Sequence, residues 1–151
     1  MKTLKLILLA VVTMLFGIAN SNAQNYKAPA IDASGKVTDA MGKHIGWVTK
    51  DGVIKDSAGT KIAHIDTEGS LVDAKSGKKL GKAQKNGNYI SHTSKTSDGT
   101  LTVSEPSNGT CEVKDKDGKV VLLVHESYKQ YGACAYHCLQ MKNEHKDMKM
   151  K

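Results

Sequence analysis

Three segments of the chain repeat one pattern, and this pattern decides the fold. Residues 35–48 read GKVTDAMGKHIGWV, residues 52–65 read GVIKDSAGTKIAHI, and residues 69–83 read GSLVDAKSGKKLGKA. Each segment has an opening glycine, an apolar residue, an aspartate, a second glycine and further apolar residues. A unit of about seventeen residues is too short for a helix pair but fits two short strands joined by a turn. Repetition at a short period predicts units that bury a shared core between them.

Each unit carries an aspartate shortly before a glycine. An aspartate side chain can accept hydrogen bonds from the backbone that follows it, and glycine adopts positive φ without steric cost. We therefore predict turn-forming roles for Asp39, Asp56, Asp73, Asp115, Gly42, Gly59, Gly77 and Gly118. The alternative for the four aspartates is a ring of carboxylates around an axis.

The rest of the chain extends the pattern and then changes it. A divergent fourth unit begins at Gly87, and a fifth covers residues 111–124. From Tyr128 the apolar residues are spaced three or four apart, which predicts a helix with one broad buried face. The prediction is a mainly β fold of five short hairpins around a shared core. The hairpins cover residues 35–126, one C-terminal helix covers 127–146 with Ser127 as its N-cap, and 147–151 form a flexible tail.

The Asp-x-x-Gly hairpin repeats of residues 35–124 resemble those of the five-fold β-flower family of exported bacterial proteins. The segment at 131–138, rich in Ala, Cys and His, adds to the resemblance. The resemblance implies hairpins arranged around an axis with a helix packed against them, and it implies no activity. Other short Asp-Gly repeat arrays fit the same spacing.

The N-terminus has the features of a secretory signal peptide. Lys2 and Lys5 precede an apolar run from Leu6 to Ile18, and small residues precede a cleavage position after Ala23. We predict a leader at 1–23 and a linker at 24–34. Export to the periplasm or the outside of a bacterial cell follows. No second apolar run could span a membrane once the leader is removed.

The charge of the chain argues against nucleic acid as a partner. All 22 basic residues are lysines, and the formal net charge of +7 falls to +5 when Lys2 and Lys5 leave with the leader. Recognition of phosphate and guanine relies on the planar arginine fork, which this chain lacks. Scattered lysines are also typical of solvated strand edges.

The predicted helix concentrates the groups that could carry chemistry. Thiolate, thioether and imidazole donors suit copper(I) or zinc, and the candidate ligands are Cys134, His137, Cys138, Met141 and His145. The alternative is that the same face packs against the strands and needs no cofactor. An enzyme that uses Cys134 with His137 is a third interpretation, although the sequence shows no nucleophile motif around Cys134.

Two further residues are singled out. An exported chain meets an oxidising compartment, so Cys111 on the last hairpin is predicted to pair with Cys134 or Cys138. Trp47 should point outward and is the best candidate for a contact with a ligand.

The function that fits these features best is a non-enzymatic binding module or an envelope-associated structural module. Its partner is not identified, and association with the envelope or with other copies is expected. The alternative is soft-metal binding through the helix.

Overall fold

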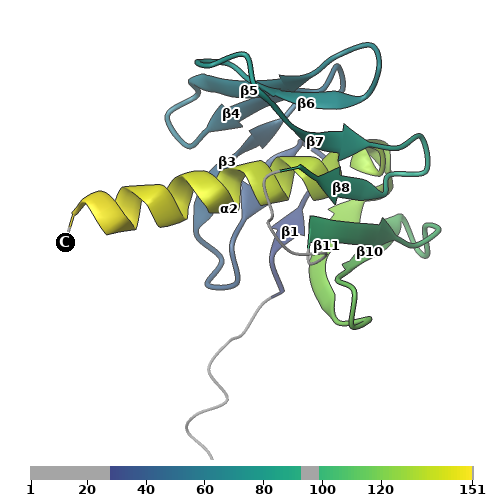
Figure 1. The fold of residues 1–151 in the computed structure, drawn as a ribbon. Helices are drawn as coiled ribbons and strands as arrows, with labels where there is room; N and C mark the ends of the chain where they lie inside the picture. Colours follow the sequence, from purple (N-terminus) through teal and green to yellow (C-terminus); the bar gives the residue numbers. More distant parts are fainter. Residues whose placement is uncertain (1–27, 93–98, 151) are drawn as a thin grey trace, which may run out of the picture.

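The computed structural model describes residues 28–92 and 99–150. The predicted leader lies outside the described residues. The described part consists of short strands followed by one long helix (Figure 1). This confirms the prediction of a mainly β chain with a C-terminal helix.

Within the described residues the strands form one closed barrel in which nearly every strand pairs with its sequence neighbours in antiparallel register. The strands are β1 (Ala30–Ile31), β2 (Lys36–Thr38), β3 (His44–Val48), β4 (Val53–Asp56), β5 (Lys61–Ile65), β6 (Ser70–Asp73), β7 (Lys79–Ala83), β8 (Tyr89–Ser91), β9 (Thr100–Val103), β10 (Thr110–Lys114) and β11 (Val120–His125).

The barrel closes through a strand that the sequence did not reveal. Ala30 pairs in parallel with Leu123 of β11 and in antiparallel with Thr38 of β2. The prediction of a linker at 24–34 is therefore wrong over its described part. A strand of two residues is too short to show an apolar alternation. Its turn nevertheless follows the repeat pattern, because Gly35 N donates to Asp32 O at 3.0 Å.

The repeated aspartates hold the turns. Asp56 Oδ1 accepts hydrogen bonds from the backbone N–H groups of Ala58 and Thr60, at 3.0 and 2.9 Å. Asp39 and Asp115 make the same pair of bonds two and four residues ahead. In the longer turn at Asp73 the acceptor is Oδ2, with Ser76 N at 2.8 Å. Each carboxylate thus bonds to its own turn, and Asp73 Oδ1 also lies 3.5 Å from Lys142 Nζ of the helix. The described residues contain no metal-holding group of three or more His, Cys, Asp or Glu side chains.

The turn glycines have the backbone conformation that the pattern requires. Gly42, Gly59, Gly77 and Gly118 have φ between 68° and 85°, a region that glycine enters without strain. In the first two of these turns the Gly N–H donates to the carbonyl of the aspartate three residues earlier, at 2.9 and 3.0 Å. A type I turn followed by a glycine at positive φ inserts an extra residue into the hairpin. The pairing register shifts accordingly beside the turns, for example between Val37 and Thr38.

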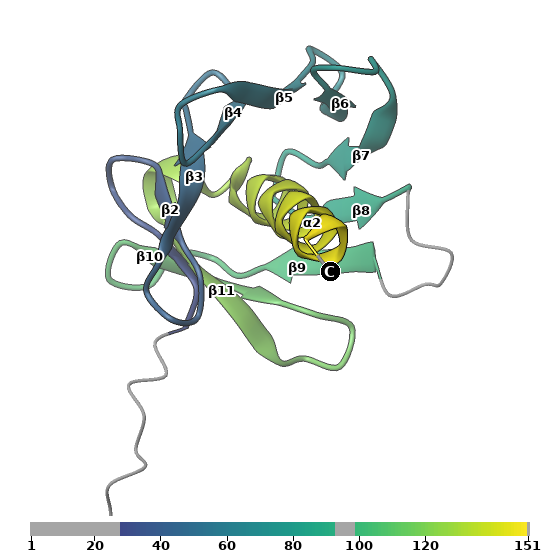
Figure 2. The ribbon, with the colours of Figure 1, turned by 90° about the vertical axis from the view of Figure 1, so that its left-hand side faces the viewer.

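The helix α2 (Gly132–Lys149) runs through the middle of the ring of strands (Figure 2). Its first two turns are buried almost all round, through Gly132, Ala133, Cys134, Ala135, Tyr136, Cys138 and Leu139. The prediction of one broad apolar face is therefore wrong. Strands surround this part of the helix, so small or apolar side chains are needed on every side of it.

The predicted bounds of the helix are also corrected. Residues Glu126–Tyr128 form a short 3₁₀ helix, η2, in which Ser127 N donates to His125 Nδ1 at 3.2 Å. The α-helix begins only at Gly132, which passes so close to β11 that a Cβ atom there would lie 2.7 Å from Val124 Cγ1. It continues to Lys149, three residues past the predicted end. Lysines in the last turn favour this extension because they oppose the negative end of the helix dipole.

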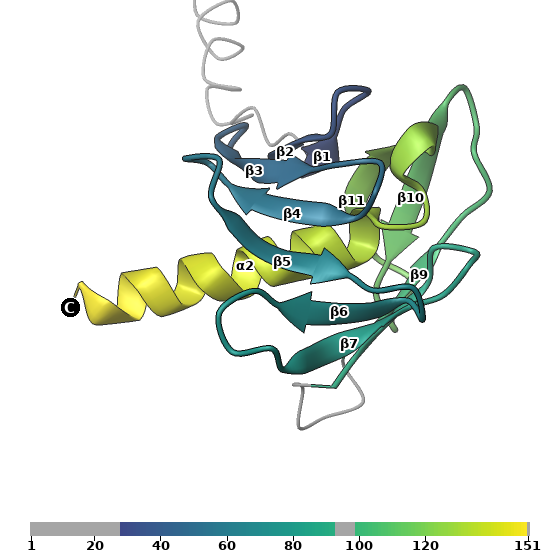
Figure 3. The same ribbon diagram turned by 90° about the horizontal axis from the view of Figure 1, so that it is seen from above.

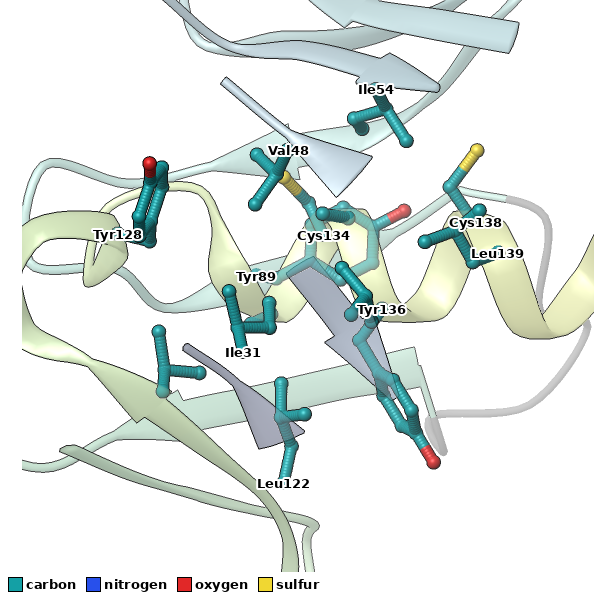
Figure 4. Close-up of a cluster of buried hydrophobic side chains, with 14 of the residues drawn as sticks. Ile31, Val48, Ile54, Tyr89, Leu122, Tyr128, Cys134, Tyr136, Cys138 and Leu139 are labelled. Carbon is teal, nitrogen blue, oxygen red and sulfur yellow. The ribbon is translucent and has the colours of Figure 1, made fainter. Parts of the chain in front are cut away.

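The core lies between the helix and the inner faces of the strands (Figure 4). Its largest fully buried members are Tyr89, Ile54, Leu71, Leu122, Leu139, Val37, Val48, Val113, Val124, Cys111, Cys134 and Cys138. Residues 142–150, which we call the stem, are exposed, and the helix projects beyond the strands there (Figure 3). No helix in the described ranges has both the length and the apolar character needed to cross a membrane.

Candidate functional site

The two thiols of the helix face the interior of the barrel. Cys134 and Cys138 are buried, and Cys134 Sγ donates to Tyr131 O at 3.0 Å. Burial raises the pKa of Cys134 well above its usual range, and the neighbouring Cys138 raises it further. Burial likewise raises the pKa of Cys138 to about 11. Both groups are therefore protonated at neutral pH, and a protonated thiol is a poor nucleophile and a poor metal ligand.

His137 lies beside the aromatic ring of Tyr89, with ring centroids 5.2 Å apart. Its Nε2 is buried and has no hydrogen-bond partner within the described part of the chain. Burial lowers the pKa of this imidazole, while Glu144 raises it in part. The residue also lines a cavity of about 380 Å³ together with Tyr136 and Lys119. In the described part of the chain, the Cys134 thiol donates to Tyr131 O and not to His137, whose Nε2 has no partner.

The five predicted metal ligands are not brought together. Cys134 and Cys138 are enclosed by strands, Met141 is half-buried at the mouth of the barrel, and His145 is exposed on the stem. His145 instead lines a cavity of about 350 Å³ that opens between the stem and the β4–β5 turn. Residues spaced for one helical stripe are thus divided between an enclosed segment and a solvated one.

The predicted disulfide is not present. Cys111, Cys134 and Cys138 are all free and buried. Burial raises the pKa of the Cys111 thiol, and the charged groups that act on it are Lys129, Glu105 and Glu126, near the start of the helix. Lys142 and Asp73, at the opposite mouth, act on Cys138. Pairing of Cys111 with Cys134 or Cys138 therefore stays a prediction, because the three thiols are free in this structure.

Trp47 lies on the outer face of β3 between two lysines. In the cross-strand register it is opposite Lys36 of β2 and Lys55 of β4. The half-buried indole packs edge-on with the His44 ring, with centroids 4.8 Å apart and planes at 71°. His44 Nε2 is in turn 3.0 Å from Gly46 O. The aromatic ring is therefore held in place at the surface.

A cavity of about 440 Å³ adjoins this tryptophan. Its lining includes the hydroxyl residues Ser34 and Thr49 and the lysines Lys50 and Lys55. Within residues 28–92 and 99–150, none of Lys36, Lys50 and Lys55 forms a salt bridge. Trp47 was predicted from its outward position, but the lysines beside it were not, because their proximity depends on strand register.

No family model, no curated protein and no solved structure matches the chain. The interpretation of the site therefore depends on its geometry alone. That geometry encloses the thiols inside the barrel and leaves one aromatic residue among lysines on the outside.

Proposed function

We propose that this protein is an exported, non-enzymatic binding module of the bacterial envelope. One observation carries the proposal: the helix occupies the interior of the barrel, so the space that could form an internal substrate site is filled by protein. Ligand pockets in barrels usually lie in the interior or at its mouth. With the interior filled and the thiols protonated, contacts are left to the outer surface and to the cavities beside the helix.

We further propose that the ring is built from five repeated hairpins, β2–β3, β4–β5, β6–β7, β8–β9 and β10–β11, as in the five-fold β-flower family. The shared turn geometry supports this, since the bonds made by Asp56 Oδ1 recur at Asp39 and Asp115. The β8–β9 connection includes residues outside the described ranges, where the repeat was already divergent in sequence. A rigid scaffold of this kind suits recognition by surface residues that the strands hold at fixed spacing.

The experiment is co-sedimentation of the purified protein, without residues 1–23, with cell envelopes from the bacterium that produces it. We expect the protein to pellet with the envelopes and to be released by salt. A protein that stays in the supernatant at low salt would contradict an envelope-binding role. Bovine serum albumin and an unfolded, carboxymethylated sample of the same chain serve as controls for trapping.

The alternative of soft-metal binding has its own test. The ligands predicted on the helix would bind copper or zinc only if Cys134 and Cys138 left the interior, which means opening the barrel. We expect protein from a culture supplemented with copper and zinc to carry less than one metal per chain under reducing conditions. Stoichiometric metal, lost on Cys134→Ser together with Cys138→Ser, would establish the alternative.

A further inference from the structure

We propose that the outer face of β2, β3 and β4, centred on Trp47, binds a linear anionic glycan, a sugar chain bearing carboxylate or sulfate groups. This inference rests on the proposed function as a binding module and names its ligand class. The row consists of Lys36, Trp47 and Lys55, which the strand register places side by side. Lys61 of β5 is paired with Lys55 and continues the row by one strand.

The spacing of the row suits an extended chain of charges. Neighbouring strands lie ~4.8 Å apart, so the two lysines that flank Trp47 originate ~10 Å from each other. The positive charges follow a line across the strands and do not converge on one point. A single small anion would contact only one of these lysines, whereas a polymer with repeated negative groups can contact several in succession.

The chemistry of the tryptophan favours a sugar between those charges. A pyranose ring has faces of C–H groups that pack on an aromatic ring, and indole offers a large apolar surface with one polar N–H. The contact with His44 fixes the ring before a ligand arrives, which reduces the entropy lost on binding. Ser34 and Thr49 line the adjoining cavity. Their hydroxyl protons are used within their own turns, by Asp32 Oδ1 and Val53 O, so toward a sugar these oxygens serve as acceptors.

The combination does not follow from the repeat itself. The positions equivalent to Trp47 in three other hairpins are His64, Lys82 and Leu123. His64 is flanked by Val53 and Val72. Lys82 is flanked by Ser70 and Ile90, and Leu123 by Glu112 and Ala30. An aromatic residue between two lysines therefore occurs at one place among these four positions. A structural requirement of the hairpin would have produced it in each unit.

The acidic groups near the row do not neutralise it. The pKa of Asp32 is lowered mainly by hydrogen bonds from Ser34, with a smaller contribution from Lys36. The pKa of Asp51 is lowered mainly by a hydrogen bond from Thr49, with smaller contributions from Lys55 and Lys61. Asp32 Oδ1 already accepts bonds from Ser34 and Lys36 backbone N–H groups within its own turn. Lys50 adds a further positive charge at the cavity. The lysines of the row thus outnumber these two carboxylates.

Trp47 is the single tryptophan of the chain, so its fluorescence reports directly on the proposed site. The protein without residues 1–23 is titrated at low salt with polygalacturonate, heparin, neutral dextran and oligo(dT). We expect a saturable change in emission with one or both anionic glycans, weakened by added salt because exposed charges are screened. The two glycans distinguish carboxylate from sulfate recognition.

No change with either anionic glycan, or an equal change with dextran, would overturn the proposal. Tighter binding of oligo(dT) would also overturn it in favour of nucleic acid.

Variants separate a built site from diffuse attraction. We expect Lys36→Gln with Lys55→Gln to weaken binding about tenfold, equivalent to ~1.4 kcal/mol shared between the two half-buried lysines. Lys75→Gln with Lys82→Gln removes the same charge elsewhere and should change affinity less than about twofold. Equal losses of affinity in the two double variants would overturn the proposal. Trp47→Leu removes the fluorescent reporter, so its binding is measured by affinity electrophoresis in gels that contain the glycan. We expect the glycan to slow the wild-type protein in the gel but not this variant. If the Lys36→Gln/Lys55→Gln variant pellets with envelopes as well as the wild type does, the proposed glycan site is wrong, and the proposed function still stands. Wild-type protein that binds glycan but not envelopes would contradict the proposed function instead.

Discussion

Gly46 of β3 and Leu139 of α2 approach so closely that a Cβ atom on Gly46 would lie 2.6 Å from Leu139 Cδ2. The same Cβ would also meet the carbonyl oxygen of Lys55 on the next strand. The helix can occupy the ring because the strand presents no side chain at this point. Ala63, at the equivalent position of the next hairpin, is the smallest alternative and is fully buried.

We predict that Gly46→Ala lowers the free energy of unfolding by ~1–3 kcal/mol, the usual cost of overpacking a core. Leu139→Ala alone should cost ~2–5 kcal/mol, because it leaves a cavity. The double variant should lose less than the two single variants together, since the smaller side chain makes room for the added methyl group. Urea unfolding measures all three. If the losses of the two single variants add exactly in the double variant, Leu139 does not limit the space at Gly46.

The sequence predicted much of the fold because the turns are local. An Asp that bonds to the backbone two and four residues ahead needs only its own segment, so Asp56 and Gly59 could be read from spacing. The helix was predicted from its period, but its surroundings were not. Cys134, Ala135 and Cys138 suit one packed face and an enclosed helix equally well, and only the closure of the ring decides between them.

The candidate site was less predictable for the same reason. Trp47 could be placed outward by analogy with His64 and Lys82 within the repeat. Its neighbours Lys36 and Lys55 are eleven and eight residues away in sequence and meet it only through strand register. The closing strand β1 could have been suspected from Asp32 and Gly35, which have the same spacing as Asp66 and Gly69.

The free energy of unfolding should decrease as the pH is lowered below the pKa of an unfolded histidine, because of His137. Its pKa is lowered in the folded protein, and an unfolded histidine titrates near ~6.5. Above that value both states are neutral and the residue has no effect. Below it the unfolded chain takes up a proton that the folded chain resists, so the free energy of unfolding decreases by at most ~1.4 kcal/mol per pH unit for one proton.

The measurement is urea unfolding at pH values from 8 to 5 for the wild type and for His137→Gln. The variant cannot take up this proton, so we expect its profile to be flatter below pH 6.5. The turn carboxylate of Asp73 does not interfere, because its pKa is lowered by the hydrogen bond from Ser76 N–H, and such a carboxylate loses its contribution only near pH 4 and below. Parallel profiles for the two proteins would show that His137 is not enclosed as described.

The thiols should resist alkylation in the folded state. The chain has three cysteines, each buried, with pKa values raised by burial. Only the thiolate reacts at an appreciable rate. Iodoacetamide at pH 7.5 should therefore modify no cysteine of the folded protein in the time that it takes to modify a small peptide thiol completely. In urea it should modify all three. Rapid labelling of Cys134 in the folded protein would instead revive a catalytic interpretation, and mass spectrometry identifies the site.

The turn aspartates should contribute to stability through acceptor geometry rather than charge. Asp56→Ala leaves the N–H groups of Ala58 and Thr60 without their acceptor, and we expect a loss of ~1–2 kcal/mol. Asp56→Asn keeps an oxygen at the same place and should lose less than half of that. Thermal unfolding of both variants at pH 7 tests this, and equal losses would assign the effect to the charge instead.

The two halves of α2 should differ in their importance for folding. A chain that ends at Asn143 lacks most of the stem, where every residue from Glu144 to Met150 is exposed. Surface segments of this kind change stability little, so we expect a loss below ~1 kcal/mol.

A chain that ends at Cys134 also lacks Tyr136, Cys138 and Leu139, which fill the barrel. Each large buried side chain contributes ~2–5 kcal/mol, so this chain should not fold. Near-ultraviolet circular dichroism and the emission of Trp47 distinguish the two outcomes. A folded Cys134-terminated chain would mean that the strands hold the ring without the helix, and the interior would then be available to a ligand.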